Sequence, residues 1–247
     1  MTSTHTHPLP ILMILTAHAR VKVQDADKAT GLWAEELTTP YYALIDAGYR
    51  VVLASPAGKR PSFSQGSVKP NLGENLVSVQ RFLQDTQASA ALNAPLATAD
   101  LVAADYAAVF LPGGHGTMWD TASDPDTARI VGDLFQAAKP VAAVCHGPAG
   151  LVGALRADGQ SILKDKKVNG FTAAEEQAAG WTGIVPFELE GKMRSLGGVF
   201  ESGAMWGAYA VRDGNLITGQ NPASSELVAE HLLAALAALA AVGATAA

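Results

Sequence analysis

The chain contains one cysteine, Cys145, and His146 follows it directly. The apolar run 141–144 precedes this pair and Gly147 and Pro148 follow it, a pattern that predicts a strand turning sharply into a helix. Such a turn holds its central side chain above the carboxyl ends of the strands, where open α/β sheets bind ligands. We therefore predict that Cys145 is a nucleophile whose pKa is lowered by the adjacent imidazole and the helix N-terminus. The alternative is that Cys145 is a small apolar side chain of the core.

A second glycine-rich turn, with the sequence GGHG over residues 113–116, follows another apolar run. Its glycines let backbone N–H groups approach a ligand, so the amides of Gly114 and His146 could form an oxyanion hole for a carbonyl attacked by Cys145. The alternative is a plain glycine-rich connection. The turn lacks the G-x-G-x-x-G spacing of a dinucleotide site, and the chain has no G-K-[ST], so nucleotide binding is not indicated.

These two turns meet only if the strands before them lie in one parallel sheet. Apolar runs that each precede a glycine-containing turn and a helical pattern predict such a sheet, buried on both faces, with strands at 11–15, 49–54, 107–111 and 140–144. Helical patterns predict helices over 31–47, 75–92, 127–138 and 227–239. Residues 212–215, with the sequence RDGN, predict a hairpin turn. The fold class is therefore α/β.

We predict a single domain over residues 1–247, because no linker rich in Pro, Gly or Ser divides the chain. Residues 1–9 are expected to form a flexible N-terminus. Residues 55–73 are polar and without periodicity, and a loop of that length in a compact domain is usually functional or mobile. We expect it to cover a site.

Composition excludes several classes of protein. The 247 residues are 49% hydrophobic and 16% charged, which excludes a disordered chain, and the net charge of -6 argues against a nucleic-acid partner. A single cysteine forms no intramolecular disulfide, which predicts a reducing compartment, the cytoplasm. The first ten residues lack the basic region of a signal peptide. The apolar tail after Glu230 extends for little more than ten residues, so we expect a packed helix and no membrane partner.

Five segments of the chain carry a resemblance to a known family: DYAAVFLPGGHGTMWD, AAVCHGPAGL, TGLWAEELTTPYYAL, VNGFTAAEE and ITGQNPAS. Together they resemble the DJ-1/PfpI superfamily, specifically its Hsp31-like, glyoxalase III-like branch, whose fold is like that of class I glutamine amidotransferases. The resemblance implies a flavodoxin-like three-layer α/β sandwich, a nucleophilic cysteine, a homodimer and, as in several members, cofactor-independent conversion of methylglyoxal to lactate. Residues 55–98 are not diagnostic of the family, and we interpret segment 55–100 as a family-specific insertion or cover.

The resemblance assigns the family's nucleophile to Cys145, its partner to His146 and the acidic residue beside the thiol to Glu36. The helical periodicity of residues 31–47 independently favours Glu36 over Glu35, because Glu36 lies at the margin of the apolar stripe and Glu35 lies toward solvent. A carboxyl group at a buried edge has a raised pKa, which suits proton transfer. The alternative is that Glu36 is an ordinary boundary glutamate.

The resemblance assigns the residue that orients the histidine to Glu176. Thr172 and Glu175 have the spacing of a capping box, so Glu175 has a local role and Glu176 is freer to accept a hydrogen bond from His146. The alternative is a solvated glutamate in the first turn of a helix. The residues predicted to bind the oxyanion or substrate are Gly114, His115 and Gly147.

These residues lead to the hypothesis of a glutathione-independent glyoxalase acting on a small aldehyde such as methylglyoxal. Cys145 would form a hemithioacetal and Glu36 would move a proton between adjacent carbons, giving a 2-hydroxy acid. We expect no cofactor and no metal, since no H-x-x-x-H pair is present. A cysteine hydrolase (deglycase, amidase or protease) and a redox-responsive stress chaperone remain alternatives. His18 could line the site, whereas core packing is the default for the tryptophans.

Overall fold

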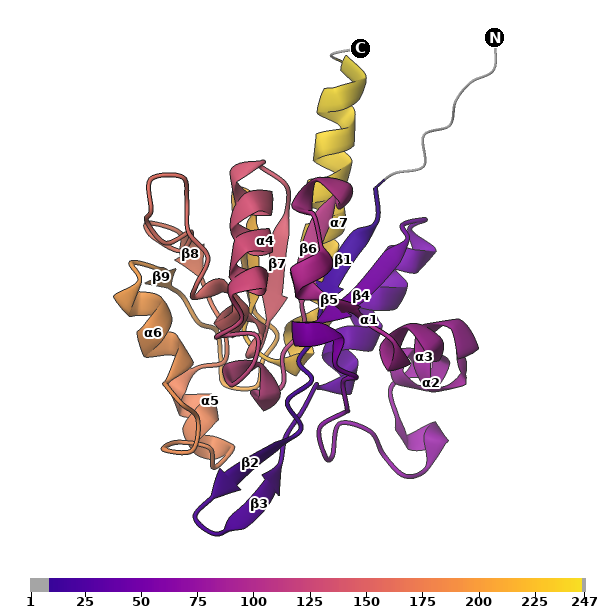
Figure 1. Cartoon of the computed structure of the whole chain (residues 1–247), viewed down its shortest axis with the longest axis vertical. Coiled ribbons are helices and arrows are strands. Elements are labelled where there is room, and N and C mark those ends of the chain that lie inside the picture. The colour runs from indigo at the N-terminus through magenta and orange to yellow at the C-terminus, as the bar shows by residue number, and fades with distance from the viewer. Residues whose placement is uncertain (1–8, 246–247) are drawn as a thin grey trace.

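The computed structural model describes residues 9–245 and is built on one seven-stranded sheet (Figure 1). The N-terminal segment expected to be flexible, residues 1–9, lies outside the described residues except for Leu9. The strand order is β10-β11-β7-β6-β1-β4-β5, and every neighbouring pair is parallel except β10 with β11. The bounds are β1 Ile11–Ile14, β4 Val51–Ser55, β5 Leu96–Ala97, β6 Ala108–Leu111, β7 Val141–Val144, β10 Ala210–Asp213 and β11 Leu216–Gly219.

The four strands predicted from the sequence form the centre of this sheet. Every residue of β1, β6 and β7 is buried, which explains why these strands are continuous apolar runs in the sequence. In the parallel register Met13 lies between Leu53 of β4 and Phe110 of β6. The predicted mostly parallel sheet is therefore confirmed, and its carboxyl edge carries both glycine-rich turns.

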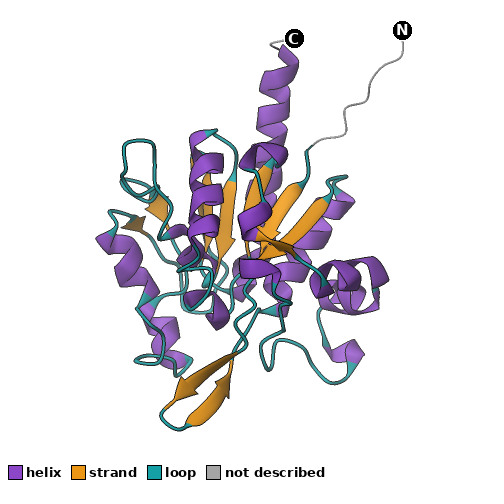
Figure 2. Ribbon diagram, viewed as in Figure 1, coloured by secondary structure: helices purple, strands orange, loops and turns teal. Residues whose placement is uncertain are grey.

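Helices cover both faces of the sheet (Figure 2). The helices α1 (Ala34–Asp46) and α7 (Ser225–Thr245) pack against each other on one face, and α4 (Pro125–Gln136) packs against β6 and β7 on the other. This is the flavodoxin-like three-layer arrangement that the resemblance implies. The shorter helices are α2 Val77–Gln84, α3 Thr86–Asn93, α5 Ala173–Ala178 and α6 Leu189–Ser195. The 3-10 helices are Pro56–Gly58, Leu72–Glu74, Thr98–Asp100, Ala103–Asp105, His115–Met118, Gly147–Leu151 and Pro222–Ser224.

Asp85 divides the helix predicted over residues 75–92 into two. The helix α2 ends at Gln84, and the Asp85 carboxylate accepts hydrogen bonds from the amides of Gln87 and Ala88 in the first turn of α3. An aspartate is a strong N-cap because its side chain replaces backbone partners that the first turn lacks. The single predicted helix was wrong at this point.

Two strand pairs were not predicted. A hairpin of β2 (Arg20–Val23) and β3 (Ala26–Ala29) projects from the carboxyl edge of the sheet (Figure 1), and β8 (Lys167–Val168) pairs with β9 (Val199–Phe200). Most residues of the hairpin are exposed, so its sequence lacks a buried face. By contrast, the hairpin predicted at 212–215 is present between β10 and β11.

The last helix, α7 (Ser225–Thr245), is longer than the helix predicted over residues 227–239. The stretch Pro222–Ala241 is long and apolar enough to cross a membrane by length and composition alone. Its first half nevertheless packs as a core helix, because Val228, Leu232 and Leu236 are buried where α7 meets the sheet and α1. Its final turns extend beyond the body of the protein (Figure 1).

Candidate active site

Cys145 lies directly after β7, in the sharp turn that the sequence predicts. Its φ is +60°, in the left-handed region that a residue other than glycine adopts only under constraint. The turn is held on both sides: the Cys145 amide donates to the Gly219 carbonyl at 2.9 Å, and the Cys145 carbonyl accepts from the Phe171 amide at 2.8 Å. Gly147 is buried so close to the Leu111 carbonyl that a side chain there would collide with it. These constraints fix the thiol at the wall of a cavity.

The prediction of a lowered pKa for Cys145 is wrong for this site. The turn leads into the five-residue 3-10 helix Gly147–Leu151, and a helix this short lacks the dipole of the α-helix that was expected. Burial raises the pKa of the thiol well above its usual value, and the neighbouring Glu36 raises it further. Hydrogen bonds from the backbone N–H groups of His146 and Gly114 lower it by less. The thiol therefore stays protonated until a base removes its proton.

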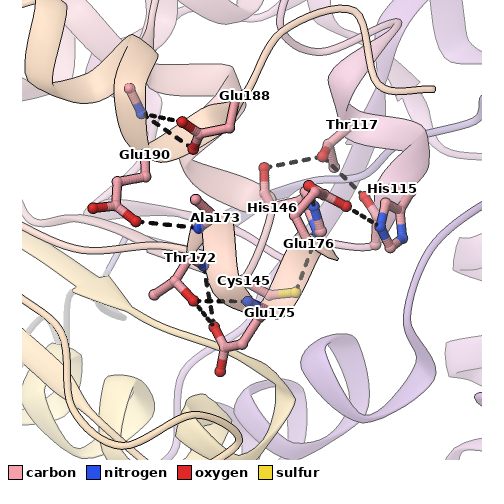
Figure 3. A network of polar contacts seen from close by, with 12 residues as sticks. His115, Thr117, Cys145, His146, Thr172, Ala173, Glu175, Glu176, Glu188 and Glu190 are labelled. Atoms are coloured by element: carbon pink, nitrogen blue, oxygen red, sulfur yellow. Dashed lines mark hydrogen bonds and ion pairs between the residues drawn. The ribbon is translucent and has the colours of Figure 1, made fainter. Parts of the chain in front are cut away.

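His146 is the base within reach of that thiol. Its ring is fully buried, with Nδ1 3.4 Å from the Cys145 sulfur and Nε2 2.8 Å from Oε2 of Glu176 (Figure 3). An ionised carboxylate only accepts hydrogen bonds, so Nε2 carries the imidazole proton and Nδ1 is left to accept a proton from sulfur. The structure thus brings together the three residues predicted as nucleophile, base and orienting acid.

Glu176 holds a second imidazole as well. Nε2 of His115 lies 2.8 Å from Oε1 of Glu176, and the His115 ring stacks on Trp181 with centroids 4.1 Å apart and planes at 18°. Although burial opposes ionisation, hydrogen bonds from His115 and His146 lower the pKa of Glu176 to about 2. Burial lowers the pKa of His115 to about 4, so its ring is neutral at neutral pH. Glu176 is thus a fixed negative charge that accepts hydrogen bonds from two imidazoles.

Glu175 has the separate local role expected of it. The Thr172 hydroxyl accepts from the Glu175 amide at 3.1 Å, and Oε2 of Glu175 accepts from the Thr172 amide at 3.1 Å, which completes the predicted capping box (Figure 3). The other carboxylate oxygen accepts from the side chains of Gln220 and Asn221. Both carboxylate oxygens of Glu175 accept hydrogen bonds from groups other than His146. Glu176 is therefore the carboxylate that hydrogen-bonds the His146 imidazole.

Glu36 reaches the thiol from the first turn of α1. It is fully buried, and Oε2 accepts the Gly113 amide at 2.7 Å, while Oε1 has no hydrogen-bond partner of good geometry within the protein. Burial raises the pKa of Glu36 from its usual 4.5 to about 8, against the lowering effects of contacts with the Cys145 thiol and the Gly113 amide. Glu35 is only half-buried and lies outside this cavity, as the helical periodicity predicts.

The two glycine-rich turns bring backbone donors to the sulfur. The amides of Gly114 and His146 both hydrogen-bond Cys145, and the Thr117 hydroxyl ties the turns together by donating to the carbonyls of Gly114 and His146, each at 2.9 Å. These amides are therefore placed to reach an oxygen on a carbon bonded to sulfur. Gly147, which was predicted to bind the oxyanion or substrate, does not line the cavity. It shapes the turn instead.

A cavity of about 460 Å³ opens beside Cys145. The sequence interpretation placed the tryptophans in the core by default, but three of the four line this cavity. Segment 55–100 contributes Ser64 and Gln65 to the lining, while its role as a cover stays a prediction, and the unpredicted β2–β3 hairpin contributes Lys28 and Ala29. His18 is not a lining residue; its ring stacks on Trp119 with centroids 5.6 Å apart. The aromatic lining residues are Trp33, Phe171, Trp181 and Trp206.

His115, His146 and Glu176 are also a donor set that could hold a metal ion. One ligand atom from each lies within 4.8 Å of the others, and two imidazoles with a carboxylate suit zinc. Hydrogen bonds between the same atoms already account for the arrangement, because each imidazole lies 2.8 Å from its own carboxylate oxygen. A metal-free site stays a prediction.

Comparison with known proteins shows matches along nearly the whole chain. The model of the DJ-1/PfpI family matches residues 28–235. Glyoxalase 3 of Candida albicans is 30% identical over 91% of this chain and 97% of its own length, and glutathione-independent glyoxalase HSP31 of Saccharomyces cerevisiae is 28% identical over 93% and 98%. The crystal structure of glyoxalase III from Candida albicans aligns with a TM-score of 0.84 at 29% identity, over 93% of this chain and 98% of that one. The chain therefore belongs to the DJ-1/PfpI family.

Proposed function

We propose that the protein is a glutathione-independent glyoxalase that converts small 2-oxoaldehydes such as methylglyoxal to 2-hydroxy acids. The observation that carries this proposal is a thiol, Cys145, next to a buried carboxyl, Glu36, whose pKa of about 8 lets it exchange a proton near neutral pH. Relatives named glyoxalase 3 and glutathione-independent glyoxalase support it.

In the first step the thiol adds to the aldehyde. His146 Nδ1 takes the thiol proton as sulfur bonds to the aldehyde carbon, and the carbonyl electrons move to oxygen. The amides of Gly114 and His146 stabilise that oxyanion, and the imidazolium then returns its proton to it. Glu176, ionised and 2.8 Å from Nε2, stabilises the transient imidazolium. The product is a hemithioacetal on Cys145.

In the second step Glu36 moves hydrogen between the two carbons. Its ionised form removes the hydrogen from the carbon bonded to sulfur, which gives an enediolate with the negative charge on the former ketone oxygen, and then returns that proton to the neighbouring carbon. The hydroxyl proton of the hemithioacetal moves to the former ketone oxygen, and a thioester of the 2-hydroxy acid remains. Oε1, the carboxyl oxygen without a partner of good geometry, is the atom free for this transfer. The raised pKa makes Glu36 a stronger base than an exposed glutamate.

Hydrolysis of the thioester completes the cycle. Water attacks the thioester carbonyl, the 2-hydroxy acid leaves, and the Cys145 thiol is restored. Overall, one water is consumed and one carbon is reduced as its neighbour is oxidised, so no external electron acceptor takes part.

The test is the turnover of methylglyoxal by purified protein without glutathione or added metal, with lactate as the measured product. The wild type should form lactate and Cys145→Ala should not. Glu35→Gln is the matched control, because Glu35 adjoins Glu36 in sequence but lies outside the cavity. A wild type that forms no lactate while Cys145 still reacts with alkylating agents would reject the glyoxalase and favour a cysteine hydrolase.

We further propose a homodimer, as the family resemblance implies, and a cytoplasmic location, as the single cysteine indicates. The apolar residues 237–241 of α7 are exposed, with Leu239 at 43%, and they support a contact with a second copy. Light scattering on the purified protein tests this, and a monomer mass at micromolar concentration would contradict it.

A further inference from the structure

The cavity is larger than methylglyoxal requires. Its volume of about 460 Å³ lies in the range of pockets that enclose drug-sized ligands, whereas methylglyoxal has three carbons and two oxygens. Its walls include the rings of Trp33, Phe171, Trp181 and Trp206, which favour contact with carbon chains. A substrate that fills this space extends beyond the 2-oxoaldehyde group.

Lys28 is the one lysine or arginine among the residues that line the cavity. It comes from β3, its Nζ lies 3.6 Å from the centroid of the Trp181 ring, and it donates to the Gly180 carbonyl at 3.3 Å. Within residues 9–245 no carboxylate forms an ion pair with it, whereas the other lysine of the hairpin, Lys22, pairs with Asp27 at 2.9 Å. Lys28 therefore has donor capacity for an anion from outside the chain.

No negative charge that lines the cavity neutralises Lys28. Glu36 is the only acidic lining residue, and its carboxyl is largely protonated at neutral pH. The ionised Glu176 directs its two oxygens at His115 and His146. The cavity is therefore positive at the end formed by the hairpin.

A stack of three aromatic rings lies between the Lys28 ammonium and the site of the proposed reaction at Cys145. Its ammonium lies over the Trp181 ring, Trp181 stacks on His115 at 4.1 Å, and the His115 ring lies 4.1 Å from the ring of His146. An anion held by Lys28 is thus separated from the carbon bonded to Cys145 by the width of this stack. The substrate group that reaches Lys28 must sit at the end of a chain.

We propose that Lys28 recognises a carboxylate, so that the preferred substrates are 2-oxoaldehydes with a carboxylate at the end of a carbon chain. This inference rests on the proposed glyoxalase function and names its substrate class. A carboxylate is favoured over a phosphate because phosphate sites in proteins gather several cationic or backbone donors. In this cavity Lys28 is the one lysine or arginine among the lining residues.

The chemistry of such a substrate balances in the same way as that of methylglyoxal. With 4,5-dioxopentanoate, sulfur bonds to the aldehyde carbon, the hydrogen of that carbon moves to the adjacent ketone carbon, and water releases the acid. The product is 2-hydroxyglutarate, one water is consumed, and the distal carboxylate is unchanged.

The test compares kcat/KM for 4,5-dioxopentanoate and its longer homologues with kcat/KM for their neutral methyl esters. For at least one chain length the wild type should prefer the carboxylate by roughly tenfold at low ionic strength, mainly through KM, and salt should reduce the preference. Lys28→Gln should remove the preference but keep turnover of the esters, Lys28→Arg should retain it, and Lys28→Glu should reverse it. Lys22→Gln, in the same hairpin, is the matched control and should keep the wild-type ratio.

Each of the other possible outcomes would contradict a specific part of the proposal. Equal losses on acid and ester in Lys28→Gln would show that Lys28 only anchors the hairpin on Trp181, and the inference would fail. A wild type that turns over methylglyoxal without any preference for carboxylates, or with a preference for a phosphate-bearing 2-oxoaldehyde, would overturn carboxylate recognition alone. A wild type inactive on every 2-oxoaldehyde would overturn the proposed function as well.

Discussion

Two glutamates beside the reactive thiol and its histidine end in opposite protonation states. Glu36 on α1 is 0% exposed and Glu176 on α5 is 2% exposed, so both side chains are shielded from solvent, and Glu36 is the more deeply buried of the two. The pKa of Glu36 is raised to about 8 by burial, whereas that of Glu176 is held at about 2 by two imidazole donors despite burial. The difference lies in the donors: Glu36 receives one backbone N–H and contacts a thiol, and Glu176 has an imidazole at each oxygen. Hydrogen bonds from two imidazoles thus outweigh burial at Glu176, whereas burial outweighs the fewer hydrogen bonds at Glu36.

This difference divides the work of the proposed reaction. A carboxyl with a pKa near 8 gains and loses a proton around neutral pH, so Glu36 can carry hydrogen between substrate carbons. A carboxylate with a pKa near 2 does not take up a proton under those conditions, so Glu176 acts as a fixed charge that orients His146. Giving Glu36 the surroundings of Glu176 should therefore abolish the hydrogen transfer. Giving Glu176 the surroundings of Glu36 should instead abolish the orientation of His146.

The largest effect is expected from Glu36→Gln. Glutamine keeps the shape of the side chain but cannot carry a proton, so turnover of methylglyoxal should fall on the order of 10²–10⁴-fold while the aldehyde adduct on Cys145 still forms. Intact mass of the trapped adduct and lactate formation measure the two steps separately. Cys145→Ser should suppress both steps, and Glu35→Gln should suppress neither. Full activity in Glu36→Gln would reject the proton transfer.

A smaller effect, on the order of 10²-fold, is expected from Glu176→Gln. An amide has only one oxygen, so it can no longer accept a hydrogen bond from each imidazole at its own oxygen, and His146 loses the tautomer that leaves Nδ1 free for the thiol. The loss should appear in the rate of adduct formation, measured by mass over time. Glu190→Gln is a control at a glutamate that bonds the Ala173 amide. An unchanged adduct rate in Glu176→Gln would remove Glu176 from the triad and leave a dyad of Cys145 and His146 that acts with Glu36.

The sheet and the turn at the cysteine could be predicted from the sequence, because strands buried on both faces are continuous apolar runs. The same holds for the capping box of Thr172 and Glu175, which depends on a spacing of three residues. The β2–β3 hairpin has mostly exposed residues, and β8 and β9 have two residues each, so neither leaves a periodic pattern. Lys28 was therefore missed as a lining residue.

The electrostatics of the site could be predicted only in part. The raised pKa of Glu36 followed from its place at the edge of an apolar stripe, which is a local property. The pKa of Cys145 depends on the burial of the thiol and on the neighbouring Glu36 of α1, and neither is encoded in the residues adjacent to the cysteine. The hydrogen bond between His115 and Glu176 joins positions 61 residues apart, so it arises only from the packing of α5 against the 3-10 helix His115–Met118.

The pH dependence of kcat/KM tests whether Glu36 acts as the base while Glu176 stays ionised. Because Glu36 must be ionised to take the substrate hydrogen, kcat/KM should rise about tenfold per pH unit below 7 and level off around pH 8, while the Glu176 carboxylate contributes no limb in this range. The residual activity of Glu36→Gln should lack this limb, and Glu35→Gln should keep it. Steady-state rates between pH 5.5 and about pH 9 measure it. A flat profile for the wild type would contradict the role of Glu36 as the base.

The smallest effect concerns stability, where the two glutamates act with opposite sign. The folded pKa of Glu36 is raised, so between its unfolded value of 4.5 and about 8 the folded state holds a proton that the unfolded state has lost, and stability falls as pH rises. For Glu176 the folded pKa is lowered to about 2, so its contribution is present above 4.5 and is lost as pH falls through about 2.

In a Cys145→Ala background, which removes the coupled thiol, Glu36→Gln should therefore be stabilising, and the gain should grow by about 1.4 kcal/mol per pH unit from pH 5 to about pH 8. Glu176→Gln should instead be destabilising throughout that window, by an amount that does not change with pH there. Denaturant unfolding of the three variants at four pH values measures both slopes. If the Glu36→Gln difference were constant with pH, the Glu36 carboxyl would be ionised in the folded protein, and the contrast with Glu176 on which the proposed division of work depends would be wrong.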